Sequence, residues 1–144
     1  PGWIMPTIQD FITEVRSWID TPFKHAGRVK GVGVDCVGIL AGAGKTCGII
    51  DYDNVNYSPQ SVDSAFLISE LSRFADIIPI RDRRPGDILL INVRGNAQHT
   101  GVMVTSDTFI HAYQSAGKVC ETRLEPHFIR SLVAVFRIKA ELCS

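Results

Sequence analysis

The 144-residue chain lacks the marks of a strongly charged, membrane-spanning or repetitive protein. Lysine plus arginine and aspartate plus glutamate number 15 each, so it has no net charge and no basic stripe for binding nucleic acid. No apolar run approaches the roughly 20 residues that span a bilayer. Its 45% hydrophobic and 21% charged residues are typical of a globular chain rather than a disordered one. We therefore expect one folded domain with no nucleic-acid partner and no membrane span.

Motifs for disulfide frameworks and metal sites are also missing. The four cysteines contain no CxxC pair, and the four histidines form no HxxxH or HExxH pair. Disulfide frameworks are typical of small, cysteine-dense secreted chains, which this is not. We therefore expect free cysteines, no structural zinc and no cofactor.

The start of the chain lacks the basic-then-apolar order of a signal peptide. We therefore expect synthesis in the cytoplasm without direct secretion. Met5 is a candidate natural start, with residues 1–4 as an added segment, so the predicted domain covers residues 5–144.

Hydrophobic spacing predicts helices in the first half of the chain and strands in the second. Apolar positions at helical spacing predict a helix over residues 8–19 with Thr7 as its cap, and a buried helix over 36–47. A third predicted helix is capped by Ser61. After Pro79, strand-like runs occupy residues 88–93, 100–105, 109–113, 119–123 and 133–138. This order indicates an α+β domain with helices packed on an antiparallel sheet.

Cys36 stands where a glycine-containing loop meets the predicted buried helix. At a helix N-terminus, unpaired N–H groups and the helix dipole stabilise an anion, so we expect the pKa of this thiol to fall. A thiolate is a nucleophile, which makes Cys36 a candidate catalytic residue. Asp35 opposes ionisation through its like charge, so a cationic partner is required. Alternatively, Cys36 is a small buried apolar residue, as many free cysteines are.

His99 and His111 lie on neighbouring predicted strands. Their side chains share a face of the sheet only if the residue numbers of directly opposed residues add up to an even number, as for Gly101 opposite His111. That register requires a loop with an odd number of residues around positions 106–107. The two side chains then meet as diagonal neighbours, about 7–8 Å apart at the backbone. In that arrangement His99 can serve as general base while His111 fixes its tautomer. Alternatively, His99 is a half-buried strand histidine bonded to a carbonyl group.

Five stretches together resemble the NlpC-type cell-wall cysteine peptidases, which have a compact papain-like fold with the nucleophile at a helix N-terminus. The stretches are Thr21–Arg28, Gly33–Gly38, Arg84–Ile88, His99–Val102 and Phe109–Ala112. Residues 133–137 fit the closing strand of that family. The Gly27-Arg28 pair and residues 56–59 look most like members encoded with phage tail genes.

The resemblance implies that Cys36 is the nucleophile, His99 the base and His111 the third polar residue of a catalytic triad. It implies hydrolysis of peptidoglycan stem peptides, at the bond from γ-D-glutamate to a diamino acid, through a thioester. The expected partner is therefore a peptidoglycan peptide, with phage tail proteins as a further expectation. Action at the cell wall would require delivery by another machine, and a phage tail fits that need.

Three residues near the nucleophile are candidate substrate-binding positions, each with a simpler alternative. Asp35 can recognise a substrate ammonium or cap the helix. Arg28 can contact a substrate carboxylate or be an exposed loop residue. His25 can line the cleft or face solvent.

Two positions depart from the family pattern. Many members have a tyrosine where Phe23 stands, and its hydroxyl helps to form the oxyanion site. Many also have serine after the nucleophile, where this chain has Val37. Two alternatives therefore stand beside the peptidase: an amidase or acyltransferase with the same catalytic residues, and a non-catalytic tail component or murein-binding module.

Overall fold

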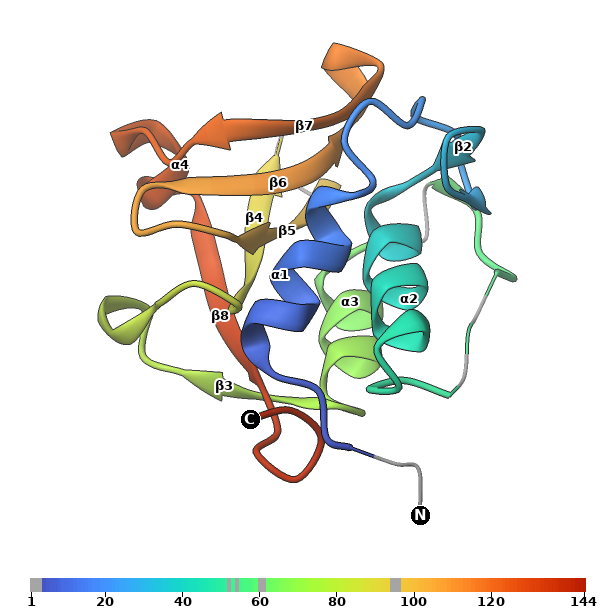
Figure 1. The fold of residues 1–144 in the computed structure, drawn as a ribbon. Coiled ribbons are helices and arrows are strands. Elements are labelled where there is room, and N and C mark those ends of the chain that lie inside the picture. Colours follow the sequence, from blue (N-terminus) through green and yellow to red (C-terminus); the bar gives the residue numbers. More distant parts are fainter. Residues whose placement is uncertain (1–3, 52, 54, 60–61, 94–96) are drawn as a thin grey trace.

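The computed structural model describes residues 4–51, 53, 55–59, 62–93 and 97–144 (Figure 1). The helices are α1 (Ile8–Arg16), α2 (Cys36–Thr46), α3 (Ser64–Leu71) and α4 (Pro126–Arg130). The strands are β1 (Arg28–Val29), β2 (Gly33–Val34), β3 (Ala75–Ile78), β4 (Ile88–Val93), β5 (Ala97–Met103), β6 (Thr108–Tyr113), β7 (Lys118–Arg123) and β8 (Leu132–Ile138). Short 3₁₀ turns occur at η2 (Ile80–Asp82) and η3 (Gln114–Ala116). Within these described ranges, no helix is long and apolar enough to cross a membrane.

Six strands form one sheet in the order β3-β8-β4-β5-β6-β7, and every neighbouring pair is antiparallel. Strands β1 and β2 form a separate small hairpin directly before α2. Figure 1 shows α1, α2 and α3 together on one side of the sheet, with α2 beside α1. This arrangement confirms the predicted α+β class.

The first helix begins as predicted and ends early. Thr7 Oγ1 accepts from the Asp10 N–H at 3.0 Å, and Asp10 Oδ2 accepts from the Thr7 N–H at 2.9 Å, a reciprocal capping box. The helix ends at Arg16 instead of reaching residue 19, and Trp18 follows in a turn. Trp18 is nevertheless buried against α2, where an added Cβ on Gly42 would lie 2.3 Å from the indole ring.

Strand β4 is buried on both faces, which explains its unbroken apolar sequence. Ile88 and Leu90 belong to the large core that the three helices cover. Leu89 and Ile91 point to the other face, into a smaller core that includes Phe109 and is closed partly by α4. A central strand covered on both sides needs no alternation of polar and apolar residues.

The turn before β4 is held by a buried ion pair. Asp87 is 2% exposed and accepts from Arg137 Nε at 3.0 Å and Nη2 at 2.9 Å. Its carboxylate also accepts from the Arg84 N–H at 2.9 Å, and Gly86 adopts a positive φ of 96° that favours glycine. The Arg84–Ile88 stretch therefore links the turn to β8 and has a structural role.

Several elements were not predicted. Strands β1 and β2 have only two residues each, β3 has four and α4 has five. Such short elements carry too few residues for a periodic pattern. The cap of α3 is Asp63, which accepts from the Phe66 N–H at 2.9 Å, whereas the predicted cap, Ser61, lies outside the described residues.

Candidate active site

Cys36 is the first residue of α2 and is half-buried. The preceding residue, Asp35, caps the helix, since its Oδ1 accepts from the Gly38 N–H at 2.8 Å. A Cβ added to Gly38 would lie 2.4 Å from the Gly27 carbonyl oxygen, so only glycine lets the preceding loop pack directly on the helix. The glycines around Cys36 thus bring loop and helix together beneath the thiol.

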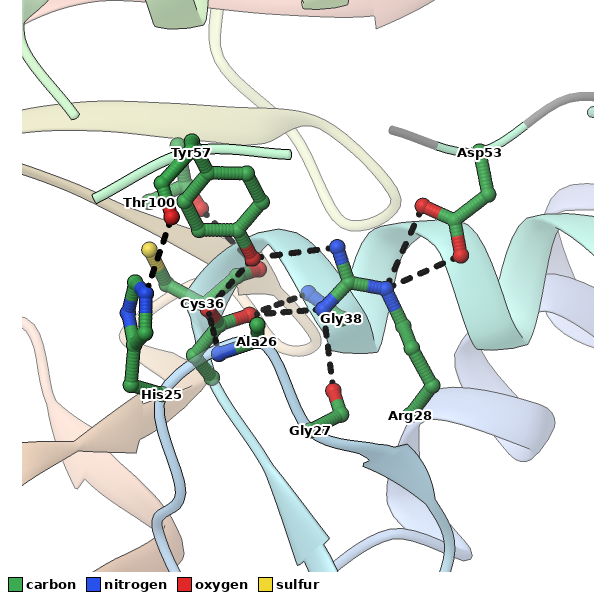
Figure 2. A network of polar contacts seen from close by, with 10 residues as sticks. His25, Ala26, Gly27, Arg28, Cys36, Gly38, Asp53, Tyr57 and Thr100 are labelled. Atoms are coloured by element: carbon green, nitrogen blue, oxygen red, sulfur yellow. Dashed lines mark hydrogen bonds and ion pairs between the residues drawn. The ribbon is translucent and has the colours of Figure 1, made fainter. Parts of the chain in front are cut away.

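A network of hydrogen bonds and ion pairs lies beside the start of α2, and Figure 2 shows the Arg28 guanidinium between Tyr57 and Asp53. Asp35 is 5% exposed and accepts hydrogen bonds from the Ala26 N–H at 2.8 Å, from Arg28 Nη1 at 3.1 Å and from the Tyr57 hydroxyl. Arg28 Nε also bonds both Asp53 oxygens, at 2.9 and 3.2 Å. The Tyr57 hydroxyl in turn accepts from Arg28 Nη2 at 3.0 Å. One guanidinium and one phenol therefore connect the loop that carries Asp53 and Tyr57 to the start of α2.

The pKa of the Cys36 thiol is raised, contrary to the sequence prediction. Burial is the larger cause and the negative charge of Asp35 the second, and together they raise this pKa to about 11. Hydrogen bonds from Thr100 and from the Val37 N–H act in the opposite direction but are weaker. With a pKa of about 11, the thiol is protonated at neutral pH.

Strands β5 and β6 pair in the register that a shared face of the two histidines requires. Val102 pairs with Ile110 and Met103 with Phe109, so the numbers of opposed residues have an even sum. The Val104 N–H donates to the Thr108 carbonyl at 3.0 Å, which closes a three-residue loop. The two histidine side chains consequently share a face, as the next contact shows.

His99 Nε2 lies 2.8 Å from His111 Nδ1. Burial lowers the pKa of His99 to about 4, and burial followed by repulsion from His99 lowers that of His111 to about 3. Both rings are therefore neutral at pH 7. Because Nε2 of His99 is engaged by His111, Nδ1 is the nitrogen through which His99 can exchange a proton with another group.

Cys36 and His99 line the same cleft, which has a volume of about 490 Å³. Its walls come from the loop before α2, the start of α2, the loop before α3 and the strands β4 to β6 with η3. The lining residues are Phe23, His25, Asp35, Cys36, Pro59, Val62, Val93, Gln98, His99, Ala112, Tyr113, Gln114 and Ser115. The residues that carry the thiol and the imidazole therefore border one cavity.

Two of the three candidate substrate-binding residues line the cleft, and the third does not. His25 and Asp35 line the cleft, and His25 Nε2 donates to the Tyr57 carbonyl at 3.0 Å. Arg28 is not among the lining residues, and its three guanidinium nitrogens all bond to protein acceptors. Phe23 lines the cleft with a ring that has no hydrogen-bond donor. In the part of the chain that the structure describes, no three histidine, cysteine or acidic side chains are grouped to hold a metal ion.

Sequence reasoning gave no role to three residues that contact the site. Tyr57 and Asp53 lie in a loop without periodicity, so nothing in the sequence indicates that they reach Asp35 and Arg28. Thr122 lies 2.9 Å from His111 Nε2. Strand alternation could have placed Thr122 on the face of β7 that it shares with Cys120, but not next to His111.

Comparison with known proteins shows the family and the fold of the chain. The NlpC/P60 family profile matches residues 20–137. An NlpC/P60 family protein from Bacillus cereus shares the fold with a TM-score of 0.70 and 21% identity over 94% of this chain and 41% of its own. The P60 domain of antigen MAP1204 from M. avium subspecies paratuberculosis has a TM-score of 0.63 and 21% identity, over 91% of this chain and 93% of its own. The peptidoglycan hydrolase RipB from Mycobacterium tuberculosis has a TM-score of 0.66 and 18% identity, over 92% of this chain and 65% of its own.

The chain thus spans less than half of the B. cereus protein and about two thirds of RipB. No curated protein matches the chain.

Proposed function

The chain belongs to the NlpC/P60 family, and from this premise we propose that it is a cysteine peptidase that cleaves peptidoglycan stem peptides. The observation that carries the proposal is one cleft lined by Cys36 and His99, with His111 bonded to His99 at 2.8 Å. A nucleophile, a base and a group that orients the base are the parts that acyl transfer requires. RipB, which shares the fold, is a peptidoglycan hydrolase.

In the first step, Cys36 Sγ attacks the carbonyl carbon of the scissile amide. Because the resting thiol is protonated, His99 Nδ1 must accept its proton as the bond to carbon forms. The neutral state of His99 at pH 7 suits this task. The backbone N–H of Cys36, in the first turn of α2, would donate to the developing oxyanion.

In the second step, His99 returns the proton to the leaving amine, and the C–N bond breaks to leave a thioester on Cys36. Water then attacks the thioester with His99 as base, releasing the carboxylic acid and restoring the thiol. Phe23 cannot supply the hydroxyl donor that many relatives have at its position, so the reaction depends on other oxyanion donors.

For the substrate, we propose the bond from γ-D-glutamate to a diamino acid. Asp35 lines the cleft beside Cys36, where a carboxylate favours a substrate that carries an ammonium group. His25 lines the cleft and completes the proposed binding residues together with Asp35. The contacts of Arg28 support holding Asp35 in place rather than direct contact with a substrate carboxylate.

We further propose that the protein acts at the cell wall after delivery, as part of a phage tail. The support for this is the likeness of the Gly27-Arg28 pair and residues 56–59 to tail-encoded members. Arg28 and Tyr57, which belong to these two stretches, bond to each other at 3.0 Å. Co-purification of the chain with assembled tails would support this placement, and its absence from intact tails would contradict it.

Digestion of purified murein tests the proposed activity. Wild-type protein, Cys36→Ala and a matched Cys47→Ala control, at a half-buried cysteine outside the cleft lining, are incubated with murein and with defined stem peptides. The new termini are identified by mass spectrometry. We expect a new amino terminus on the diamino acid with wild type and Cys47→Ala, and none with Cys36→Ala. Cleavage by Cys36→Ala would refute the mechanism. Release of a non-peptide amide or acyl group would indicate the amidase or acyltransferase, and binding without cleavage the non-catalytic module.

A further inference from the structure

The hydrogen-bond chain from His99 continues past His111 to strand β7. His111 Nδ1 faces His99 Nε2 at 2.8 Å, and His111 Nε2 lies 2.9 Å from Thr122 Oγ1. Thr122 Oγ1 in turn lies 3.6 Å from Cys120 Sγ. The β6–β7 register pairs His111 with Cys120 and Phe109 with Thr122, so the threonine is a diagonal neighbour of the histidine.

His111 is surrounded by aromatic rings, which offer few hydrogen-bond partners to its ring nitrogens besides His99 and Thr122. The residue is 1% exposed, and the ring stacks on Tyr113 with a centroid distance of 4.7 Å and an interplanar angle of 17°. The rings of Phe109, at 4.4 Å, and Phe128, at 6.3 Å, also contact it. A neutral imidazole in this apolar enclosure has one N–H donor and one acceptor nitrogen.

The chain can run in two directions. In the first, His99 Nε2–H donates to His111 Nδ1, and His111 Nε2–H donates to Thr122 Oγ1. In the second, Thr122 donates to His111 Nε2, His111 Nδ1–H donates to His99 Nε2, and the His99 proton moves to Nδ1. Only the first direction leaves His99 Nδ1 as an acceptor, so the second disables the base.

We propose that Thr122 is a positioning residue that selects the first direction by accepting a hydrogen bond from His111 Nε2–H while its own hydroxyl hydrogen points to Cys120 Sγ. A threonine hydroxyl can donate and accept at once, and the sulfur gives its hydrogen a weak acceptor away from His111. The proposed effect on catalysis rests on the proposed peptidase function, whereas the tautomer assignment does not.

The test compares Thr122→Val, which removes the hydroxyl at nearly constant shape, with Thr122→Ser, which retains it. Thr108→Val is the matched control, because Thr108 is also half-buried in the sheet but bonds to Thr105 and Glu121. ¹⁵N chemical shifts of the imidazole nitrogens report the tautomers directly, and steady-state kinetics on a stem peptide separate kcat from KM.

We expect Nε2–H on both His99 and His111 in wild type, Thr122→Ser and Thr108→Val. Thr122→Val should move both protons to Nδ1 and lower kcat by about 10- to 100-fold with little change in KM. Nδ1–H on His111 in wild type, or wild-type tautomers in folded Thr122→Val, would overturn the proposal. If Thr122→Val does not fold, Nε2–H tautomers in wild type and a kcat of Thr122→Ser near that of wild type would support the proposal. Nδ1–H on His111 in wild type would overturn it. An inactive wild type with Nε2–H tautomers would refute the peptidase function but not the role of Thr122.

Discussion

The two walls of the cleft are held by different kinds of interaction. The nucleophile wall, at the start of α2, is fixed by charges: Asp35 and Asp53 share the guanidinium of Arg28, and Tyr57 bonds to two members of that network. The base wall, on β5 to β7, is fixed by neutral groups, with His99, His111 and Thr122 in a chain among aromatic rings.

This difference follows from what each wall has to do. The nucleophile wall must hold a loop, a helix N-terminus and a thiol in one place, and charge-assisted hydrogen bonds are strong and directional. The base wall must keep an imidazole unprotonated in one tautomer, which a nearby carboxylate would oppose by raising its pKa. Burial and, second to it, the negative charge of Asp35 raise the pKa of the Cys36 thiol on one wall, while burial lowers the pKa values of the histidines on the other.

Breaking the base wall should give the largest effect. His99→Ala removes the only group we assign to proton transfer, so kcat should fall by about 10³-fold with the fold intact. His127→Ala is the control, because His127 is exposed on α4, outside the cleft. Stem-peptide cleavage measured by liquid chromatography checks this, and activity of His99→Ala near that of wild type would remove His99 from the mechanism.

Breaking the nucleophile wall should reduce stability rather than change the chemistry. Arg28→Met leaves the Asp35 and Asp53 carboxylates without their shared cation, so we expect a loss of about 3 kcal/mol in the free energy of unfolding. Arg16→Met, which breaks the more exposed pair with Glu121, should lose less than about 1 kcal/mol. Urea denaturation measures both, and equal losses would show that the network is no more than a surface ion pair.

Lowering the pH should reduce the free energy of unfolding through the buried histidines of the base wall, with a smaller effect than the substitutions above. The native histidine pKa values, about 4 and 3, lie below the value of about 6.5 expected in the unfolded chain. Between about pH 6.5 and 4 the unfolded chain therefore binds protons that the native state does not, so stability falls as the pH falls. Denaturation at pH 7 and 4.5 should show a smaller loss for His111→Phe than for wild type or His127→Gln. An equal loss in all three would contradict the buried neutral pair.

The sequence was sufficient for features that depend on local pattern. The capping box of Thr7 and Asp10 and the bounds of strand β4 follow from residue spacing. For β5 against β6, residue parity defines only which register would place His99 and His111 on one face, and the structure has that register. Register in particular is a matter of parity, because side chains alternate along a strand and one loop length decides which faces coincide.

Features that depend on contacts between distant segments could not be predicted. The direction of the Cys36 pKa shift depends on how deeply the thiol is buried, which the helix N-terminus alone does not reveal. Tyr57 reaches Asp35 across 22 positions of sequence, and Thr122 reaches His111 across 11. Such partners become visible only when the fold is known.

The most direct test of the mechanism is to trap the acyl enzyme. Wild-type protein is mixed with a defined stem peptide, quenched in acid within the first turnover and mapped by mass spectrometry, with Thr108→Val as a matched sample. We predict that the peptide containing Cys36 carries the acyl half of the substrate, and that hydroxylamine removes it. Product formation with Cys36 unmodified at every time point, together with cleavage by Cys36→Ala, would contradict the mechanism.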